Sequence, residues 1–334
     1  MTNLNKNRVG VLYLISILLV VSSIILGLSI GSSNTNIIDI FKEIFAGNVN
    51  SPEVKIFLYI RLPRVIGSLI CGSALALSGA IIQGVFSNKL ASPSIIGINS
   101  GAFLAVTICS CVGILGGVGQ SIFAFIGSFL TMLIIIVGLK KWGGSKSTII
   151  LIGVAINAFF GAISDIIITF FPSVGVMSND FKVGDFSAVT YPKLIPALII
   201  ITITVIITLL LSKELEVLSL GEDNAKGLGM NTKIIRIIFL VLATILAGVS
   251  VSVCGLLSFV GLLVPHAVRK FTKGETKHLL PLTVIVGGGF VTLCDTISRV
   301  IFAPYEIPVG IIMAFIGAPL FIIILLKGRT YEYD

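Results

Sequence analysis

The stretch LSLGEDNAKGLGMNTK, residues 218–233, is a polar insert between two apolar segments, 193–212 and 233–256. A helix needs about 20 apolar residues to cross the hydrocarbon core of a bilayer, and both flanking segments reach that length. Inside lipid, the backbone hydrogen bonds must close within the segment that crosses. The flanking segments therefore predict two membrane-spanning helices, and the insert predicts a connection that lies outside the bilayer.

The composition extends this prediction to the whole chain. Its 334 residues are 56% hydrophobic and 11% charged, with a mean hydropathy of +1.12, whereas soluble domains carry about 25% charged residues. A transmembrane β-barrel would show short alternating strands, but the apolar runs here are long and continuous. The sequence predicts an all-α, polytopic membrane protein that forms a single domain over residues 1–334.

Nine apolar runs are long enough to be spanning helices. They cover residues 9–30, 64–87, 94–112, 117–139, 148–171, 193–212, 233–256, 278–302 and 308–326. The shorter segment SFVGLLVPHAVRK, residues 258–270, predicts a half-helix that ends near Pro265. About ten helical segments are thus expected in total.

The distribution of basic residues predicts the orientation of these helices. With the N-terminus in the cytoplasm, most of the 23 Lys and Arg residues fall on inner segments, as the positive-inside rule requires. Both termini and the insert at 218–233 are then cytoplasmic. The formal net charge of +8 reflects this orientation and does not indicate nucleic-acid binding.

The sequence lacks the residues that several kinds of functional site require. The five cysteines lie in apolar runs without a Cys-x-x-Cys pair, and the two histidines are far apart, so no metal site, disulfide framework, cofactor or catalytic residue is expected. The nearest match to a phosphate-binding loop, GLKKWGGSKS (138–147), has Gly144 where the lysine should be. ATP hydrolysis is therefore expected only on a partner chain.

The polar insert itself allows two interpretations. It could be a solvated loop, which is the common state of polar connections. Alternatively, Leu220, Ala225, Leu228 and Met230 could form the apolar side of a short helix that docks into another protein. The insert alone does not decide between them.

Four blocks of sequence resemble the FecCD permeases, the membrane subunits of ATP-binding-cassette (ABC) importers for iron–siderophores, haem and cobalamin. The first is RLPRVIGSLICGSALALSGAIIQGVFSNKLASPSIIGINSGA, residues 61–102. The others are LGEDNAKGLG (220–229), GLLSFVGLLVPHAVRKF (255–271) and the segment 279–326. One position differs, because the family usually has Asn-Pro-Leu-Ala where this chain has Asn-Lys-Leu-Ala at 88–91.

The resemblance implies a type II ABC importer permease in a bacterial cell membrane. In such importers two permeases, identical or paralogous, lie side by side in the lipid. A pair of ATP-binding subunits lies beneath them, and an extracellular substrate-binding protein or lipoprotein docks outside. The implied cargo is a metal chelate, with a ferric siderophore as the first expectation and haem or cobalamin as alternatives. ATP hydrolysis on the partner would drive alternating access.

The resemblance also assigns the insert a role. The segment at about 214–232 would be the coupling element that contacts the ATPase. Within it, the implied coupling residues are Leu220, Gly221, Glu222, Ala225, Leu228 and Gly229. Gly221 and Gly229 would allow sharp turns at the two ends, because glycine adopts left-handed backbone angles without strain.

Further site residues follow from the resemblance. Docking of the binding protein is implied for Arg61, Arg64 and Arg299, whose guanidinium groups suit carboxylates, although arginines at such places are also ordinary interface anchors. A gate or pathway role is implied for Asn88, Leu90 and Ser147, while Asn157 could line the pore or bond between helices. Asp295 precedes Arg299 by four residues, so one helical face should pair them.

Two other classes of protein remain as alternatives. An ion-coupled secondary transporter would need acidic relays deep in the membrane, and the spans offer only Asp165 and Asp295, both near their outer ends. A membrane enzyme would need clustered His, Asp or Glu residues, and the sequence does not suggest such a cluster.

Overall fold

The computed structural model describes residues 6–31, 40, 42–44, 46–47, 50–114, 116–142, 146–272 and 275–329, without the side chains at 6–7, 139–142, 146–147, 149 and 324–329. All regular elements in these ranges are helical. They are α1 (Lys6–Ser29), α3 (Pro52–Ile56), the π-helix η1 (Phe57–Arg61), α4 (Leu62–Phe86), α5 (Ile98–Cys111), α6 (Gly117–Trp142), α7 (Lys146–Phe170), α8 (Pro172–Val183), α9 (Tyr191–Leu210), α10 (Ser212–Ser219), α11 (Glu222–Gly227), α12 (Thr232–Cys254), α13 (Val260–Thr272), α14 (Thr276–Val300) and α15 (Val309–Arg329). The predicted all-α fold class is confirmed.

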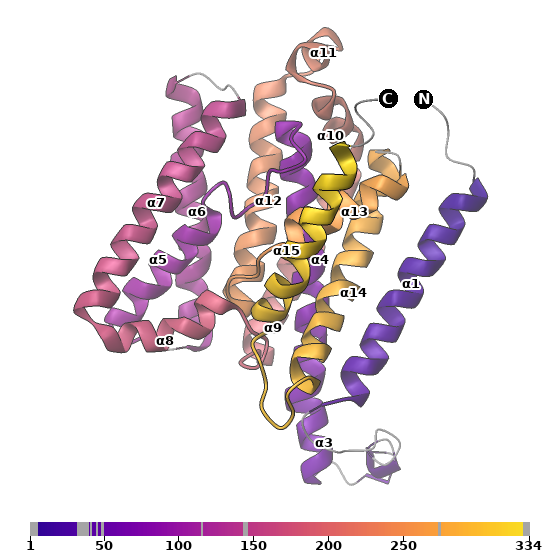
Figure 1. Cartoon of the computed structure of the whole chain (residues 1–334), viewed down its shortest axis with the longest axis vertical. Helices are drawn as coiled ribbons and strands as arrows, with labels where there is room; N and C mark the ends of the chain where they lie inside the picture. Colours follow the sequence, from indigo (N-terminus) through magenta and orange to yellow (C-terminus); the bar gives the residue numbers. More distant parts are fainter. Residues whose placement is uncertain are drawn as a thin grey trace.

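The buried helix α4 lies at the centre of the bundle. It packs mainly against α14, α12 and α13, while α5, α6 and α7 form a group on one side and α1 covers α14 on the other (Figure 1). Small residues make this centre compact, with Cys71, Ala74, Ala76 and Ala80 at most 1% exposed. Helices in lipid associate by close van der Waals packing, so these small side chains position α4 as the hub.

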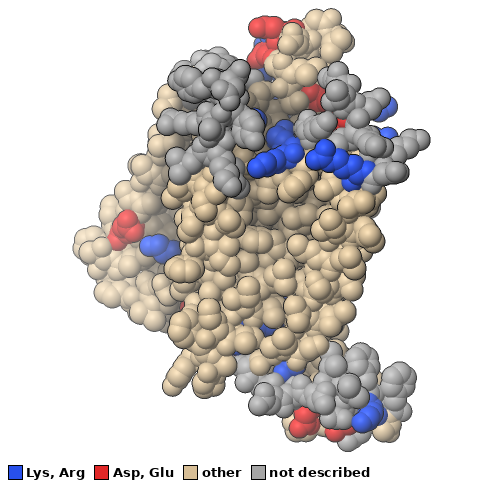
Figure 2. All heavy atoms as spheres, turned by 45° about the vertical axis from the view of Figure 1, so that its right-hand side comes forward, with Lys and Arg blue, Asp and Glu red and all other residues tan. Residues whose placement is uncertain are grey.

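Seven of the described helical segments are long and apolar enough to cross a membrane, and α5 and the segment Val309–Ile323 of α15 are shorter apolar helices. The faces they present outward agree with a lipid environment. Figure 2 shows Lys, Arg, Asp and Glu gathered at the two ends of one face, with a wide band of other residues between them that charges interrupt only at one edge. Exposed apolar side chains are numerous on α1, α6, α7 and α9.

The two ends of the bundle carry different elements. The start of α1, the end of α15 and α11 lie at one end, which we call the α11 end (Figure 1). Helix α3 and the loop 301–308 between α14 and α15 lie at the other, which we call the α3 end. The predicted topology requires the chain termini and the polar insert on one side, so this arrangement agrees with it. The compartment that the α11 end faces stays a prediction.

Helix α5 is shorter than the span predicted over 94–112. It has 14 residues and is therefore about 21 Å long at 1.5 Å per residue, less than the hydrocarbon core of about 30 Å. The chain between α4 and α5 is irregular up to Gly97, which has φ +96°. Asn157 compensates for the break, because its Nδ2 donates to the carbonyl oxygens of Ser94 at 2.9 Å and Ile95 at 3.1 Å. Irregular backbone at membrane depth is tolerated where protein satisfies its polar groups.

Helix α13 corrects a second prediction, since it continues through Pro265 to Thr272. A proline has no N–H to donate to the carbonyl four residues earlier, which here belongs to Gly261. Gln83 on α4 supplies a donor, with its Nε2 3.4 Å from the carbonyl oxygens of both Gly261 and Leu262. The proline is therefore accommodated within the helix. Helix α8 is a further element that the apolar runs did not predict.

Helices α4 and α13 meet at Gly79, where a Cβ would overlap the backbone of Gly261. We expect Gly79→Ala to lower the free energy of unfolding by about 3 kcal/mol or more, because overpacking against fixed backbone forces the helices apart. Thermal unfolding of the purified chain in detergent measures this change. Gly10→Ala is the matched control, since a Cβ on this α1 glycine meets nothing within 4 Å. Equal midpoints for the two variants would contradict the close approach.

Candidate functional site

The polar insert contains the last two residues of α10, a sharp turn and the short helix α11, at the α11 end of the bundle (Figure 1). The glycines predicted to allow turns have the required geometry, with φ +107° at Gly221 and +81° at Gly229. Leu220 and Leu228 are 48% and 67% exposed. The insert is thus an ordered element that presents two leucines to its surroundings.

Ala225 does not lie on that exposed side. It is fully buried, and Met230 packs partly buried against the core. The expectation that all four apolar residues share one docking face is therefore wrong. The reason is that a helix this close to the bundle must turn part of its apolar stripe inward, so Ala225 and Met230 hold α11 while Leu220 and Leu228 remain outside.

One ion pair fixes α11 to the start of α12, and a second lies within α11. The Glu222 carboxylate lies 2.7 Å from Arg236 Nη2 and 2.9 Å from Lys226 Nζ. Hydrogen bonds from Arg236 and then Lys226 lower the pKa of Glu222 from 4.5 to about 2. Arg236 is only 6% exposed, so the Glu222 carboxylate compensates a largely buried cation. A push on α11 would therefore reach α12 through a polar contact.

This pair predicts how α11 responds to mutation and pH. Because the folded pKa of Glu222 is depressed, its stabilisation is complete above about pH 4.5 and is lost as pH falls toward about 2. Glu222→Gln should weaken the attachment of α11 by about 1.5 kcal/mol at neutral pH, the scale of one charge-assisted hydrogen bond. A spin label at exposed Asp223→Cys, in a Cys111→Ser background, should become more mobile in this variant.

The same label provides the controls. In the otherwise unchanged chain its mobility should be equal at pH 8 and pH 5. Lys226→Gln removes only the exposed pair, which is worth about 0.5 kcal/mol at most, and should leave the label ordered. Mobility that rises as much in Lys226→Gln as in Glu222→Gln would contradict the role of Arg236.

The turn after α4 lies against α10. Ser87 has φ +46° and its Oγ donates to the carbonyl oxygen of Ser219 at 3.1 Å. The predicted gate residues follow directly, and the Oδ1 of Asn88 accepts from the N–H of Leu90 at 2.9 Å. Leu90 is 44% exposed. Ser87, which directly precedes the predicted gate residues, is thus in contact with the insert.

The other two predicted pathway residues differ. The side chain of Ser147 lies outside the described part of the structure. Asn157 is half-buried, and its amide hydrogens are bound to the backbone at 94–95. It therefore stabilises the break before α5, which is a structural role of the kind that the sequence left open. A role in lining the pathway stays a prediction.

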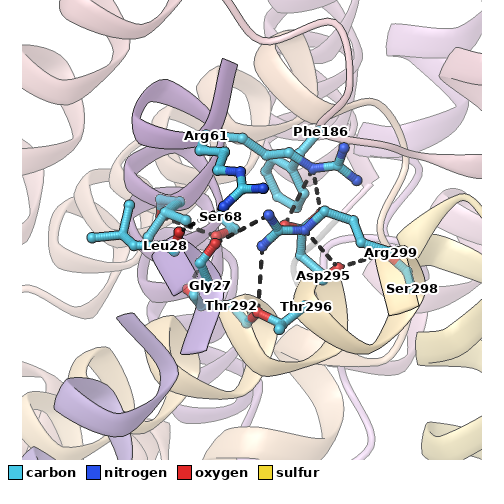
Figure 3. A network of polar contacts seen from close by, with 12 residues as sticks. Gly27, Leu28, Arg61, Ser68, Phe186, Thr292, Asp295, Thr296, Ser298 and Arg299 are labelled. Atoms are coloured by element: carbon cyan, nitrogen blue, oxygen red, sulfur yellow. Dashed lines mark hydrogen bonds and ion pairs between the residues drawn. The ribbon is translucent and has the colours of Figure 1, made fainter. Parts of the chain in front are cut away.

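The three predicted docking arginines line one pocket, and Figure 3 shows two of them, Arg61 and Arg299, close together. Arg61, Arg64 and Arg299 are at most 4% exposed. Arg61 Nη1 donates to the carbonyl oxygens of Leu28 at 3.2 Å and Ser29 at 3.4 Å. The π-helix η1 ends at Arg61 and thereby sets the direction from which α4 begins.

Asp295 lies between two of these arginines. It is fully buried, with Oδ1 3.0 Å from Arg64 Nε and Oδ2 3.2 Å from Arg299 Nη2. Arg299 also donates to the carbonyl oxygen of Gly27 at 3.1 Å (Figure 3). The predicted pairing of Asp295 with Arg299 is confirmed, whereas its bond to Arg64 was not foreseen from the sequence.

Two further carboxylates face Arg64. Glu306 Oε2 lies 2.7 Å from Arg64 Nη1, and Asp185 Oδ1 lies 3.7 Å from Arg64 Nη2. Sequence reasoning missed both, because they belong to loops far along the chain. In this conformation the arginines are engaged within the chain, and their docking role stays a prediction. Because Asp295 is held by two guanidinium groups, it does not fit the free acidic relay of an ion-coupled transporter.

The chain matches known membrane proteins over nearly its whole length. The FecCD transport family model matches residues 17–327. The hemin transport system permease protein HmuU of Yersinia pestis is 35% identical, covering 90% of this chain and 92% of that protein. The Fe(3+)-citrate import system permease protein YfmD of Bacillus subtilis is 34% identical, covering 96% of each.

A solved structure agrees with these relatives. An inward-facing metal-chelate type ABC transporter superposes with a TM-score of 0.82 at 29% identity, covering 95% of this chain and 99% of that one. The central α4, the ordered α10–α11 insert and the buried arginines are therefore features of a chain that belongs to the FecCD transport family.

Proposed function

We propose that the chain is the permease subunit of an ABC importer that carries a metal chelate into a bacterial cell, with ATP hydrolysed on a separate pair of subunits. The observation that supports this most is the ordered α11, which stands at one end of the bundle with Leu228 67% exposed (Figure 1). An apolar side chain that protrudes on a braced polar helix is suited to bury itself in a partner's groove. The chain itself would not be an enzyme.

The contacts of the insert support a route for the coupling. Helix α11 is joined to α12 through Glu222 and Arg236, and α10 is joined to the end of α4 through Ser219 and Ser87. A displacement of the insert by the ATPase would thus move two central helices together. Small helix shifts of this kind are a common way to open one side of a pore.

The opposite end would receive the extracellular binding protein. The concentration of three arginines there suits acidic side chains, because guanidinium groups stay charged and bind carboxylates in a fixed geometry. The α11 end and both chain termini would then face the cytoplasm. A second permease, identical or paralogous, would cover apolar surface that includes Phe159 on α7 and Phe315 on α15, which are 64% and 79% exposed.

The cargo class follows from the relatives. HmuU is named for hemin and YfmD for ferric citrate, and we propose a ferric siderophore as the first candidate, with haem and cobalamin as alternatives. The proposed test reconstitutes the chain in liposomes with its ATPase and binding protein, which we expect neighbouring reading frames to encode. Uptake of labelled ferric siderophore that requires ATP supports the proposal. Uptake that follows an ion gradient without ATP would favour a secondary transporter instead.

A further inference from the structure

A pocket of about 210 Å³ opens among the buried arginines at the α3 end. Its lining residues, which we call the arginine pocket, are Gly31, Ile56, Ile60, Arg61, Arg64, Arg299 and Glu306. One water occupies about 30 Å³ of liquid, so this volume exceeds that of several waters. The pocket is therefore large enough to admit a carboxylate from outside the chain.

The hydrogen-bonding capacity of the Arg64 guanidinium group is only partly satisfied within the chain. Its Nε donates to Asp295 and its Nη1 to Glu306. Its Nη2 is buried and has no hydrogen-bond partner, with Asp185 3.7 Å away. The edge formed by Nη1 and Nη2 thus holds Glu306 through one nitrogen. A carboxylate that binds both nitrogens of such an edge makes the stronger, bidentate contact.

The carboxylates around Arg64 differ in how easily they can leave. Asp295 is fully buried on a helix, whereas Glu306 is 32% exposed and lies on the loop 301–308. Its neighbours Phe302 and Tyr305 are 60% and 79% exposed. Displacing the partly exposed Glu306 carboxylate requires only a movement of the exposed loop 301–308. Displacing Asp295 would require a buried helical residue to leave the interior, so the free-energy cost for Glu306 is far lower.

We propose that Glu306 is a built-in substitute for a carboxylate of the extracellular binding protein. In the undocked chain Glu306 neutralises Arg64, and on docking an acidic side chain of the binding protein enters the arginine pocket and displaces it. The loop 301–308 is released in the exchange, and because this loop leads directly into α15, docking is communicated to that helix. This inference rests on the proposed function, in which the binding protein engages the arginines.

The exchange predicts that Glu306 competes with docking. Glu306→Gln removes the competing charge, so the dissociation constant of the binding protein for the reconstituted permease–ATPase complex should fall about tenfold, or about 1.4 kcal/mol. The matched control is Glu53→Gln, which removes one exposed negative charge from α3 at the same end. Salt screens the interactions of exposed charges at distance, so the control should change affinity little at 0.15 M salt.

Two measurements separate failure of this inference from failure of the proposed docking. If docking to the unmodified complex is unaffected by salt and by Arg64→Gln, the arginines do not receive the binding protein and both ideas fall. If salt weakens docking but Glu306→Gln binds no more tightly than Glu53→Gln, only the competition is overturned. Measuring docking affinity at several salt concentrations needs no substitution, so this test remains valid even if Arg64→Gln fails to fold.

A second readout follows the loop itself. A spin label at Tyr305→Cys, in a Cys111→Ser background that removes an exposed thiol, reports the position of loop 301–308. The spectrum should change when the binding protein is added and should resemble the docked state in Glu306→Gln before addition. An identical spectrum in all three samples would overturn the proposal.

Discussion

Replacing Leu228 by aspartate should release the chain from its ATPase and abolish ATP-driven uptake. Leu228 directly follows α11 and is 67% exposed. Burying a leucine contributes about 1.5–3 kcal/mol, and a charge in its place would also have to be desolvated. We expect at least a hundredfold loss of affinity for the ATPase, or about 2.7 kcal/mol. Co-purification with the ATPase and binding titrations measure this directly.

The controls for this experiment come from the same helix. Lys226→Gln makes the net charge more negative by one, as Leu228→Asp does, but places no charge in the proposed contact. It should retain the ATPase. Leu228→Asp should also unfold within about 0.5 kcal/mol of the unmodified chain, as surface changes usually do. If Leu228→Asp purifies with its ATPase as well as Lys226→Gln does, α11 is not the docking element.

The buried neighbour gives a contrasting result. Ala225 is a fully buried residue of α11, so Ala225→Asp should disturb the chain itself because it buries an unpaired carboxylate. Its unfolding midpoint should fall, whereas that of Leu228→Asp should not. The sequence alone placed both residues on one apolar side, whereas the structure buries Ala225 and exposes Leu228.

The spanning helices were predictable because the bilayer dictates them through local properties. Length and hydropathy are read from consecutive residues, and the structure places α4, α6, α7, α9, α12 and α14 close to the predicted runs. The two helices whose ends were wrongly predicted, α5 and α13, depend on residues distant in sequence. Helix α5 begins late because Asn157 satisfies the backbone before it, and α13 passes Pro265 because Gln83 donates to it from α4. The residues near those two breaks in the sequence do not predict these distant hydrogen-bond donors.

The candidate sites show the same division. Left-handed angles at Gly221 and Gly229 and the pairing of Asp295 with Arg299 were predictable, because they depend on residue type or helical spacing. The bond between Arg64 and Asp295 joins residues 231 positions apart, and no short-range pattern encodes it.

Replacing Asp295 by alanine should be the most destabilising single change among the charged residues at the α3 end. The Asp295 carboxylate is fully buried and contacts both Arg64 and Arg299. Without it, two guanidinium groups remain in the interior with reduced compensation. Removing one partner of a buried ion pair costs about 3–5 kcal/mol. The midpoint of thermal unfolding in detergent should fall by about 5 °C or more.

Asp165→Ala is the matched control, because Asp165 is an exposed aspartate on another spanning helix, α7, and its loss should change stability by about 0.5 kcal/mol at most. Asp295→Asn should fall between the two variants, since the amide keeps an acceptor but not the charge. If Asp295→Ala unfolds at the same temperature as Asp165→Ala, the arginines do not depend on Asp295. In that case Glu306 and Asp185, the other carboxylates near Arg64, would have to neutralise it without Asp295.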